Sequence, residues 1–194
     1  CSKIGQEVYK ITNENVILLS SIRAAEMTKL LENVYRAVNI GLVNELKELS
    51  DFLDIDINEV IKAASTKPFG FQAFSPGPGV GGHCIPIDPY YLSWKAKEFG
   101  LELKLIETAG KINASMPNFV VKKIENILKK NKNFIKSFKV LVLGLTYKKN
   151  IDDIRESPSL EIIKLLQNKG FKISYNDPYI SKELNNQLLT QDIK

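Results

Sequence analysis

Apolar residues follow a helical period over most of the chain. From Ala24 to about Ser50 they recur every three or four positions without a proline, which predicts one long helix. The same spacing predicts shorter helices over residues 56–64, 90–99 and 103–114. Pro117 is placed to open a further helix, because proline is tolerated in the first turn. This part of the chain is therefore expected to form a layer of helices.

Towards the carboxyl end the pattern becomes that of a parallel sheet. Residues 138–144 predict a buried strand, and residues 171–175 predict a second one. Between them, Ser157 and Pro158 are typical of a helix start, and the helix is expected over 159–168. A strand–helix–strand unit makes its strands parallel. The predicted fold class is α/β overall: a central all-helical domain followed by the start of a Rossmann-like parallel α/β domain.

The first twenty residues indicate the end of a larger unit. Residues 5–10 fit the end of a helix, and residues 15–20 fit a short buried strand. Because a single strand is not stable by itself, we expect the sequence to be a piece cut inside a domain. Only a polar tail follows Asp177 and Pro178, so the parallel sheet is expected to be incomplete as well.

Composition narrows the classes of partner. The 194 residues are 44% hydrophobic and 25% charged, as in a soluble globular protein. The apolar runs are too short to span a bilayer and no signal segment opens the chain, so we expect a cytoplasmic protein without a membrane partner. The net charge of +5 comes from lysines spread along the chain, which favours solvated helix faces over a nucleic-acid interface. A small anionic ligand fits this charge.

Residues 74–91 combine a glycine- and proline-rich turn with a thiol and a carboxylate. Cys84 follows the glycines and lies four positions before Asp88. The stretch from Gly77 to Gly82 satisfies G-x-G-x-x-G, but no predicted strand precedes it and no helix opens at its end. We therefore do not interpret it as a dinucleotide fingerprint.

Cys84 is either a small buried hydrophobe or a nucleophile. The backbone N–H groups of a glycine-rich turn can stabilise a developing negative charge, and a nearby lysine would lower the pKa of the thiol. His83 is not expected to be its base, because adjacent residues of an extended backbone point to opposite faces. Cys1 and Cys84 have neither a disulfide framework nor the spacing of a zinc site, so no metal is expected.

Lys29 and Asn33 are a second candidate group. They lie four positions apart and so share one face of the long helix. There they either hold an oxyanion together or belong to a charged surface with Glu26 and Glu32.

The loop over 145–157 is a third candidate, because it runs from the end of a strand to the start of a helix, where α/β sheets bind anions. Lys148 and Arg155 in this loop are placed to meet phosphates. Alternatively, Arg155 pairs within the turn with Asp152 or Asp153.

Three motifs, in order, resemble those of the UDP-glucose/GDP-mannose dehydrogenase family over essentially the whole chain. They are A-E-M-T-K-L-L-E-N at 25–33, G-G-H-C-I-P-I-D at 81–88, and G-L-T-Y-K at 144–148 with D-I-R-E-S at 153–157. Within the family, the glycine-rich loop is most similar to that of the UDP-N-acetylhexosamine 6-dehydrogenases, in particular those acting on UDP-N-acetylglucosamine.

The resemblance implies an NAD-dependent oxidation of the C6 alcohol of the UDP-sugar to a carboxylate, through an aldehyde and a cysteine thioester, in surface polysaccharide synthesis. UDP-N-acetylmannosamine and UDP-glucose are alternative substrates. It implies that Cys84 is the nucleophile, that Lys29 and Asn33 steady the C6 oxygen, and that Asp88 orders Lys29 and the hydrolytic water.

The resemblance also implies contacts with substrate and cofactor. The residues expected to wrap the sugar are Ser75, Gly77, Gly79, Val80 and Gly81. Tyr147 and Lys148 would contact the sugar or its pyrophosphate, and Arg155 would reach NAD.

The division into domains that follows is 1–21 for the end of the NAD-binding domain, 22–133 for a central helical domain and 134–194 for part of a UDP-binding domain. The apolar stripe over residues 24–50 is wide enough to need a partner, so a homodimer through the long helix is expected.

Two other classes of protein stay open. A non-catalytic dimerisation module would have an unreactive, buried Cys84. A cysteine-based transferase or hydrolase would have a base near the thiol and no nicotinamide cofactor.

Overall fold

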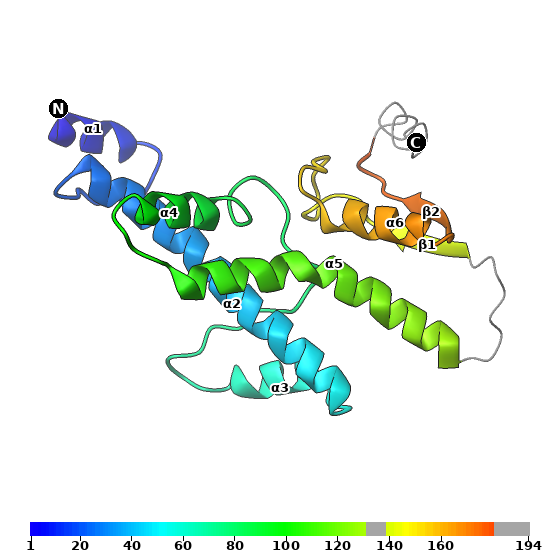
Figure 1. The fold of residues 1–194 in the computed structure, drawn as a ribbon. Coiled ribbons are helices and arrows are strands. Elements are labelled where there is room, and N and C mark those ends of the chain that lie inside the picture. Colours follow the sequence, from blue (N-terminus) through cyan, green and yellow to red (C-terminus); the bar gives the residue numbers. More distant parts are fainter. Residues whose placement is uncertain (131–138, 181–194) are drawn as a thin grey trace.

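The computed structural model describes residues 1–130 and 139–180, which form a body of helices beside a small α/β unit (Figure 1). The helices are α1 (Ser2–Tyr9), α2 (Ile22–Phe52), α3 (Ile57–Ala64), α4 (Asp88–Lys97), α5 (Lys104–Lys130) and α6 (Pro158–Asn168), and the strands are β1 (Lys139–Leu143) and β2 (Lys172–Asn176). The predicted α/β class is confirmed, with the helical layer first and the parallel strands after it.

The long helix predicted from the sequence is α2, which crosses α5 in the helical body (Figure 1). Ser21 caps it, because its side chain accepts a hydrogen bond from the N–H of Ala24 at 3.1 Å. At the crossing, a Cβ built on Gly41 would lie 3.1 Å from the Cβ of Ala109. Glycine at position 41 therefore lets the two helix backbones approach closely.

Pro117 lies inside α5, so the expected division into one helix ending near residue 114 and another opening at Pro117 is wrong. Proline has no N–H, which leaves the carbonyl of Asn113 without its helical donor. That carbonyl faces the glycine-rich loop, since a Cβ on Gly79 would lie 3.3 Å from it. Met116, Pro117 and Val121 are all buried, and this packing carries the helix through the proline.

The α/β unit is a crossover from β1 through α6 to a parallel β2, as predicted. The register places Lys139 opposite Lys172. The core beneath the sheet, shared by α5 and α6, consists of Val121, Ile162 and Leu166. The expectation of a fully buried first strand is wrong, because β1 alternates between exposed and half-buried residues and Leu143 is 74% exposed. Phe138, where that strand was expected to begin, lies outside the described residues.

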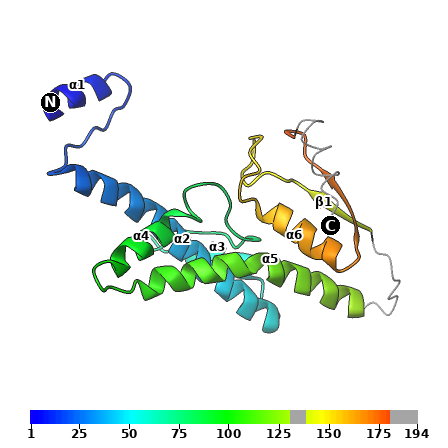
Figure 2. The same cartoon turned by 45° about the horizontal axis from the view of Figure 1, so that its top comes forward.

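Residues 15–20 do not form the expected buried strand. They pair with no strand among the described residues, and Ile17 is 80% exposed. A strand is stabilised only by its neighbours, so this segment stays irregular. The helix end expected over 5–10 corresponds to α1, which Figure 2 shows set apart from the other helices and joined to α2 by an extended segment. Among residues 1–130 and 139–180, none of the helices combines the length with the apolar composition that a membrane span requires.

An ion-pair cluster ties the end of α2 to α5. Asp51 Oδ1 lies 2.6 Å from Lys47 Nζ, one turn earlier in α2, and its Oδ2 lies 2.6 Å from Lys123 Nζ in α5. Burial raises the pKa of Asp51, but the two lysines outweigh this and hold the pKa below its ordinary value. The cluster therefore stabilises the helix pair while Asp51 is ionised.

Candidate active site

The glycine-rich loop is held against the loop over 146–157 by close backbone contacts. Gly79 and Gly82 take positive φ angles of 130° and 85°, which favour glycine. The N–H of Gly82 donates to the carbonyl of Arg155 at 3.0 Å, and a Cβ on Gly82 would lie 2.7 Å from the ring of Tyr147. No strand or helix adjoins the G-x-G-x-x-G segment, as expected for a loop that is not a dinucleotide fingerprint.

The cysteine lies at the surface, where this loop turns into α4. Cys84 is an exposed free thiol, which contradicts its interpretation as a small buried hydrophobe. Its carbonyl accepts hydrogen bonds from the N–H of Ile87 at 3.2 Å and of Asp88 at 2.8 Å. The thiol-bearing residue is thus fixed one turn before the first residue of α4.

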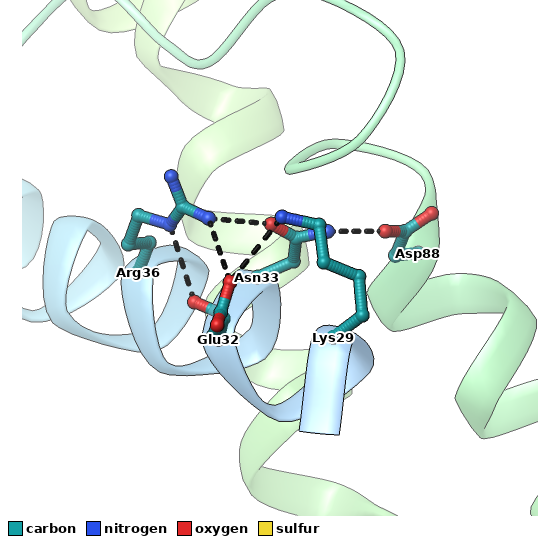
Figure 3. A network of polar contacts seen from close by, with 5 residues as sticks. All are labelled: Lys29, Glu32, Asn33, Arg36 and Asp88. Carbon is teal, nitrogen blue, oxygen red and sulfur yellow. Dashed lines mark hydrogen bonds and ion pairs between the residues drawn. The ribbon is translucent and has the colours of Figure 1, made fainter. Parts of the chain in front are cut away.

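Asn33 connects α2 to the start of α4 (Figure 3). It is 1% exposed; its Nδ2 donates to Asp88 Oδ2 at 2.5 Å, and its Oδ1 accepts from Arg36 Nη2 at 2.8 Å. The guanidinium can only donate and the carboxylate accepts, so together they fix the orientation of the amide. Asp88 also lies in the first turn of α4, where the helix dipole favours a negative charge. Its carboxylate is therefore held in place by two helices.

Lys29 has different surroundings from Asn33, although the two lie one turn apart. Its Nζ lies 3.3 Å from Glu32 Oε2, and its side chain is 62% exposed (Figure 3). The structure thus differs from the expected contact between Asp88 and Lys29, because Asp88 binds Asn33 instead. The alternative interpretation, a charged helix surface that includes Glu32, is therefore correct for Lys29 but not for Asn33, which is buried. An exposed ion pair is weak, so the ammonium of Lys29 is available to an incoming anion.

Arg155 is paired within its own turn, one of the two interpretations that the sequence left open. Its Nε lies 2.9 Å from Asp153 Oδ1, and its Nη2 lies 2.6 Å from Asp153 Oδ2. These hydrogen bonds lower the pKa of Asp153 to about 2. Its Nη1 donates to Nδ1 of His83, the residue before Cys84, at 3.2 Å. The Arg155 side chain is 58% exposed, so its cation still faces solvent.

Tyr147 and Lys148 differ in their surroundings. Tyr147 supports the glycine-rich loop, since a Cβ on Gly81 would lie 2.5 Å from the Tyr147 Cβ. Lys148 is exposed, and its carbonyl accepts a hydrogen bond from the hydroxyl of Thr146 at 3.0 Å. The start of this loop is fixed by Asp177, whose carboxylate accepts from the backbone N–H of Thr146 at 3.2 Å.

A cavity of about 1060 Å³ lies between the helical body and the α/β unit. Its walls come from the glycine-rich loop, α4, α5, α6 and β2. Of the residues predicted to wrap the sugar, Gly79 and Val80 line it. Lys29, Asn33, Cys84 and Asp88 do not line it, whereas Ile85 and Pro86, the two residues after the cysteine, do.

Three polar residues that shape this site are not predicted from the sequence. Arg36 orients Asn33, and the buried Asn44 and Asn113 bind each other and the glycine-rich loop. The available signal was spacing: Asn44 follows Asn33 by eleven residues, about three helical turns, and so lies on the same face of α2. Amides that recur on the buried face of a helix indicate a polar network.

The candidate site combines an exposed thiol, Cys84, with the carboxylate of Asp88 and the exposed ammonium of Lys29. A fixed carboxylate, an available ammonium and a shaped turn meet the needs of a covalent reaction at a carbonyl carbon. Among the described residues, no three His, Cys, Asp or Glu side chains gather as a metal site requires.

Comparisons with known proteins agree with the motifs. The central domain of the UDP-glucose/GDP-mannose dehydrogenase family matches residues 23–115, and the UDP binding domain of the same family matches residues 141–193. A UDP-N-acetyl-D-mannosamine dehydrogenase of Methanocaldococcus jannaschii is 42% identical over 92% of this chain and 39% of its own length. A UDP-N-acetyl-D-glucosamine 6-dehydrogenase of Pseudomonas aeruginosa is 38% identical over 84% of this chain and 38% of its own length.

The fold is also that of a solved relative. The structure of a UDP-D-ManNAc dehydrogenase from Pyrococcus horikoshii matches with a TM-score of 0.85 and 36% identity, over 93% of this chain and 42% of that one. The chain thus spans about two fifths of the length of the relatives that it matches. Because consecutive domains of one family match in order around the cysteine loop, the chain belongs to the UDP-glucose/GDP-mannose dehydrogenase family.

Proposed function

We propose that this chain carries the thiol site of an NAD-dependent UDP-sugar 6-dehydrogenase. The single observation that carries the proposal is the exposed Cys84 one turn before Asp88, whose carboxylate is held by the buried Asn33. A non-catalytic dimerisation module would have a buried, unreactive cysteine. A thiol kept at the surface, beside a fixed carboxylate, favours chemistry over packing.

In the proposed reaction, the thiolate of Cys84 adds to C6 of the aldehyde, forming a carbon–sulfur bond and leaving the electron pair on the C6 oxygen. Lys29 and Asn33 steady that oxygen; the ammonium can leave Glu32 to do so, because their exposed ion pair is weak. After the oxidation, water attacks the thioester, the carbon–sulfur bond breaks, and the acid and the free thiol are released. Asp88 orients that water.

The cofactor of this proposal is NAD, which supplies the acceptor for the two hydrides that C6 loses. In this chain, Arg155 is the residue proposed to contact NAD. The fit is partial: Asp153 occupies two guanidinium nitrogens, while the side chain is 58% exposed and can still offer N–H groups to a phosphate. Arg155 would therefore hold a phosphate of the cofactor with the N–H groups that Asp153 leaves open.

For the substrate we propose a UDP-N-acetylhexosamine. The glycine-rich loop would wrap the sugar through Ser75, Gly77, Gly79, Val80 and Gly81. Lys148 is exposed and suited to the pyrophosphate, whereas Tyr147 would contact the substrate only with the part of its ring that does not pack on Gly82. The relatives' names favour the mannosamine epimer over the glucosamine epimer expected from the loop sequence, since the 42% identical relative is named for the former.

We further propose that the partner of this chain is a second copy, bound through α2. The helix exposes six large apolar side chains on one side: Met27, Leu31, Tyr35, Leu42, Leu46 and Leu49. At 100° per residue they fall within a stripe about 100° wide, beside the face that packs on α5. A helix this long with such a stripe is suited to pair with its own copy.

The proposed domain division is unchanged: 1–21 for the end of an NAD-binding domain, 22–133 for the helical domain and 134–194 for part of a UDP-binding domain. The boundary between 133 and 134 lies outside the described residues.

The proposal is tested by incubating the full-length protein with NAD and a panel of UDP-sugars while recording NADH. We expect turnover with UDP-N-acetylmannosamine or UDP-N-acetylglucosamine and two NADH for each acid formed. UDP-glucose, which has no acetamido group, is the control that tests whether the enzyme requires this group in its substrate. Absence of NADH with all three sugars would refute the activity, and efficient turnover of UDP-glucose alone would refute the substrate class.

A further inference from the structure

A buried chain of amides connects the glycine-rich loop to both long helices. The N–H of Gly77 donates to Asn44 Oδ1 at 2.9 Å, Asn44 Nδ2 donates to Asn113 Oδ1 at 2.9 Å, and Asn113 Nδ2 donates to the carbonyl of Ala37 at 2.9 Å. Asn44 is 0% exposed and Asn113 is 7% exposed. We propose that Asn44 and Asn113 are positioning residues that fix the sugar-binding loop at Gly77; this rests on the function proposed above.

The direction of this amide chain is determined by its ends. A backbone N–H such as that of Gly77 can only donate, and a carbonyl such as that of Ala37 can only accept. Each asparagine must therefore present its oxygen towards Gly77 and its NH₂ towards Ala37, with no second arrangement that satisfies every group. The asparagine amide supplies this donor and this acceptor on one planar, uncharged group.

A second contact joins the glycine-rich loop to Asn113. Pro117 deprives the carbonyl of Asn113 of its helical donor, and Gly79 packs against that carbonyl, with its would-be Cβ 3.3 Å away. Asn113 thus contacts the loop through its backbone and, by way of Asn44, through its side chain. The loop is held at two glycines that the proposed function assigns to the sugar.

The test variant is Asn44→Asp in the full-length protein. Aspartate keeps the shape but has no NH₂ for Asn113, so two oxygens face each other; their repulsion turns the carboxylate away from Asn113 and withdraws the acceptor from the N–H of Gly77. The matched control is Val43→Ala, which opens a buried position of the same helix, next in sequence, without touching the amides.

Hydrogen exchange directly measures the hydrogen bond between the N–H of Gly77 and Asn44. Pro76 and Pro78 have no amide hydrogen, so Gly77 carries the only exchanging backbone amide between Ser75 and Gly79. We expect this amide to exchange about tenfold faster in Asn44→Asp than in the wild type, the scale of one lost hydrogen bond, and to stay protected in Val43→Ala. Unchanged exchange in Asn44→Asp would overturn the proposal, whatever the activity.

Enzyme kinetics measure how the loss of this contact affects substrate binding. In Asn44→Asp we expect KM for the UDP-sugar to rise about tenfold, while the alkylation rate of Cys84 without sugar stays that of the wild type. If Val43→Ala, at a comparable loss of melting temperature, raises KM equally, the amides only stabilise the fold and the proposal is wrong. If the wild type oxidises no UDP-sugar, the proposed function fails, and UDP-sugar affinity measured by calorimetry takes the place of KM with the same two outcomes.

Discussion

The proposed chemistry at the residue scale depends on an exposed thiol, Cys84, and on groups that are held near its turn from other elements. Asn33 illustrates how burial and charge decide a role: between the Arg36 guanidinium and the Asp88 carboxylate, its amide has one orientation. Lys29, one turn away, is instead exposed and weakly paired. The two residues would therefore contribute differently, the amide by fixed geometry and the lysine by an available charge.

Replacing Cys84 by serine removes the thiol at nearly constant shape. We expect Cys84→Ser in the full-length enzyme to lose about 10³-fold or more in kcat, because the hydroxyl is a poor nucleophile and forms no thioester, while UDP-sugar affinity stays near that of the wild type. Stopped assays of acid formation and calorimetric titration measure the two quantities. Cys1→Ser, the change at the other exposed cysteine, is the control and should leave both unchanged. Wild-type turnover in Cys84→Ser would remove Cys84 from the mechanism.

Lys29→Ala separates catalysis from stability. We expect kcat to fall about 10²-fold, because a cation beside an oxyanion is lost, and the melting temperature to change little, because the exposed pair with Glu32 adds little to stability. Lys95→Ala removes an equally spaced exposed pair, with Glu98, away from the site and should change neither quantity. A variant that lost stability and kept kcat would make Lys29 structural.

Amino-acid sequence predicts the individual elements of this fold well and their contacts poorly. Helical spacing identifies α2, and the βαβ unit follows from the change of period. Pro117 leads to a wrong helix boundary. The hydrogen bond that it removes from α5 is compensated by burial and by the glycine-rich loop, which packs on the freed carbonyl of Asn113. The contact of Asn44 with Asn113 joins residues 69 positions apart, so no local pattern reveals it.

The ion-pair cluster of Asp51 makes the packing of α2 on α5 depend on pH. The pKa of Asp51 is lowered in the folded protein, so its stabilisation is complete above the ordinary value of 3.8 and is lost as the pH falls below it. We expect Asp51→Asn to cost about 1 kcal/mol of unfolding free energy at pH 7 and progressively less in acid, as measured by urea unfolding at several pH values.

Asp54→Asn is the control for this pH effect, since Asp54 is exposed and takes part in no ion pair among the described residues. It should leave the unfolding free energy nearly unchanged over the same pH range. A difference between wild type and Asp51→Asn that stays constant down to the most acidic pH would show that the charge of Asp51 has no part in joining the helices.

The whole molecule is expected to be a dimer through the exposed stripe of α2. We expect Leu42→Glu with Leu46→Glu to shift the full-length protein from dimer to monomer in sedimentation, because two charges would have to be buried at the interface. Phe99→Glu, at a 71% exposed residue after α4, is the control and should leave the dimer intact. A wild type that sediments as a monomer at micromolar concentration would contradict the dimer.

The proposed mechanism requires that the sugar acylates Cys84 during turnover. The most direct measurement is mass spectrometry of the Cys84 peptide after acid quenching of the full-length protein with NAD and a UDP-N-acetylhexosamine. We predict the mass of the sugar acyl group on this peptide, none on the Cys1 peptide, and loss of the adduct in neutral hydroxylamine. An unmodified Cys84 peptide throughout turnover, with acid still formed by Cys84→Ser, would refute the thioester mechanism.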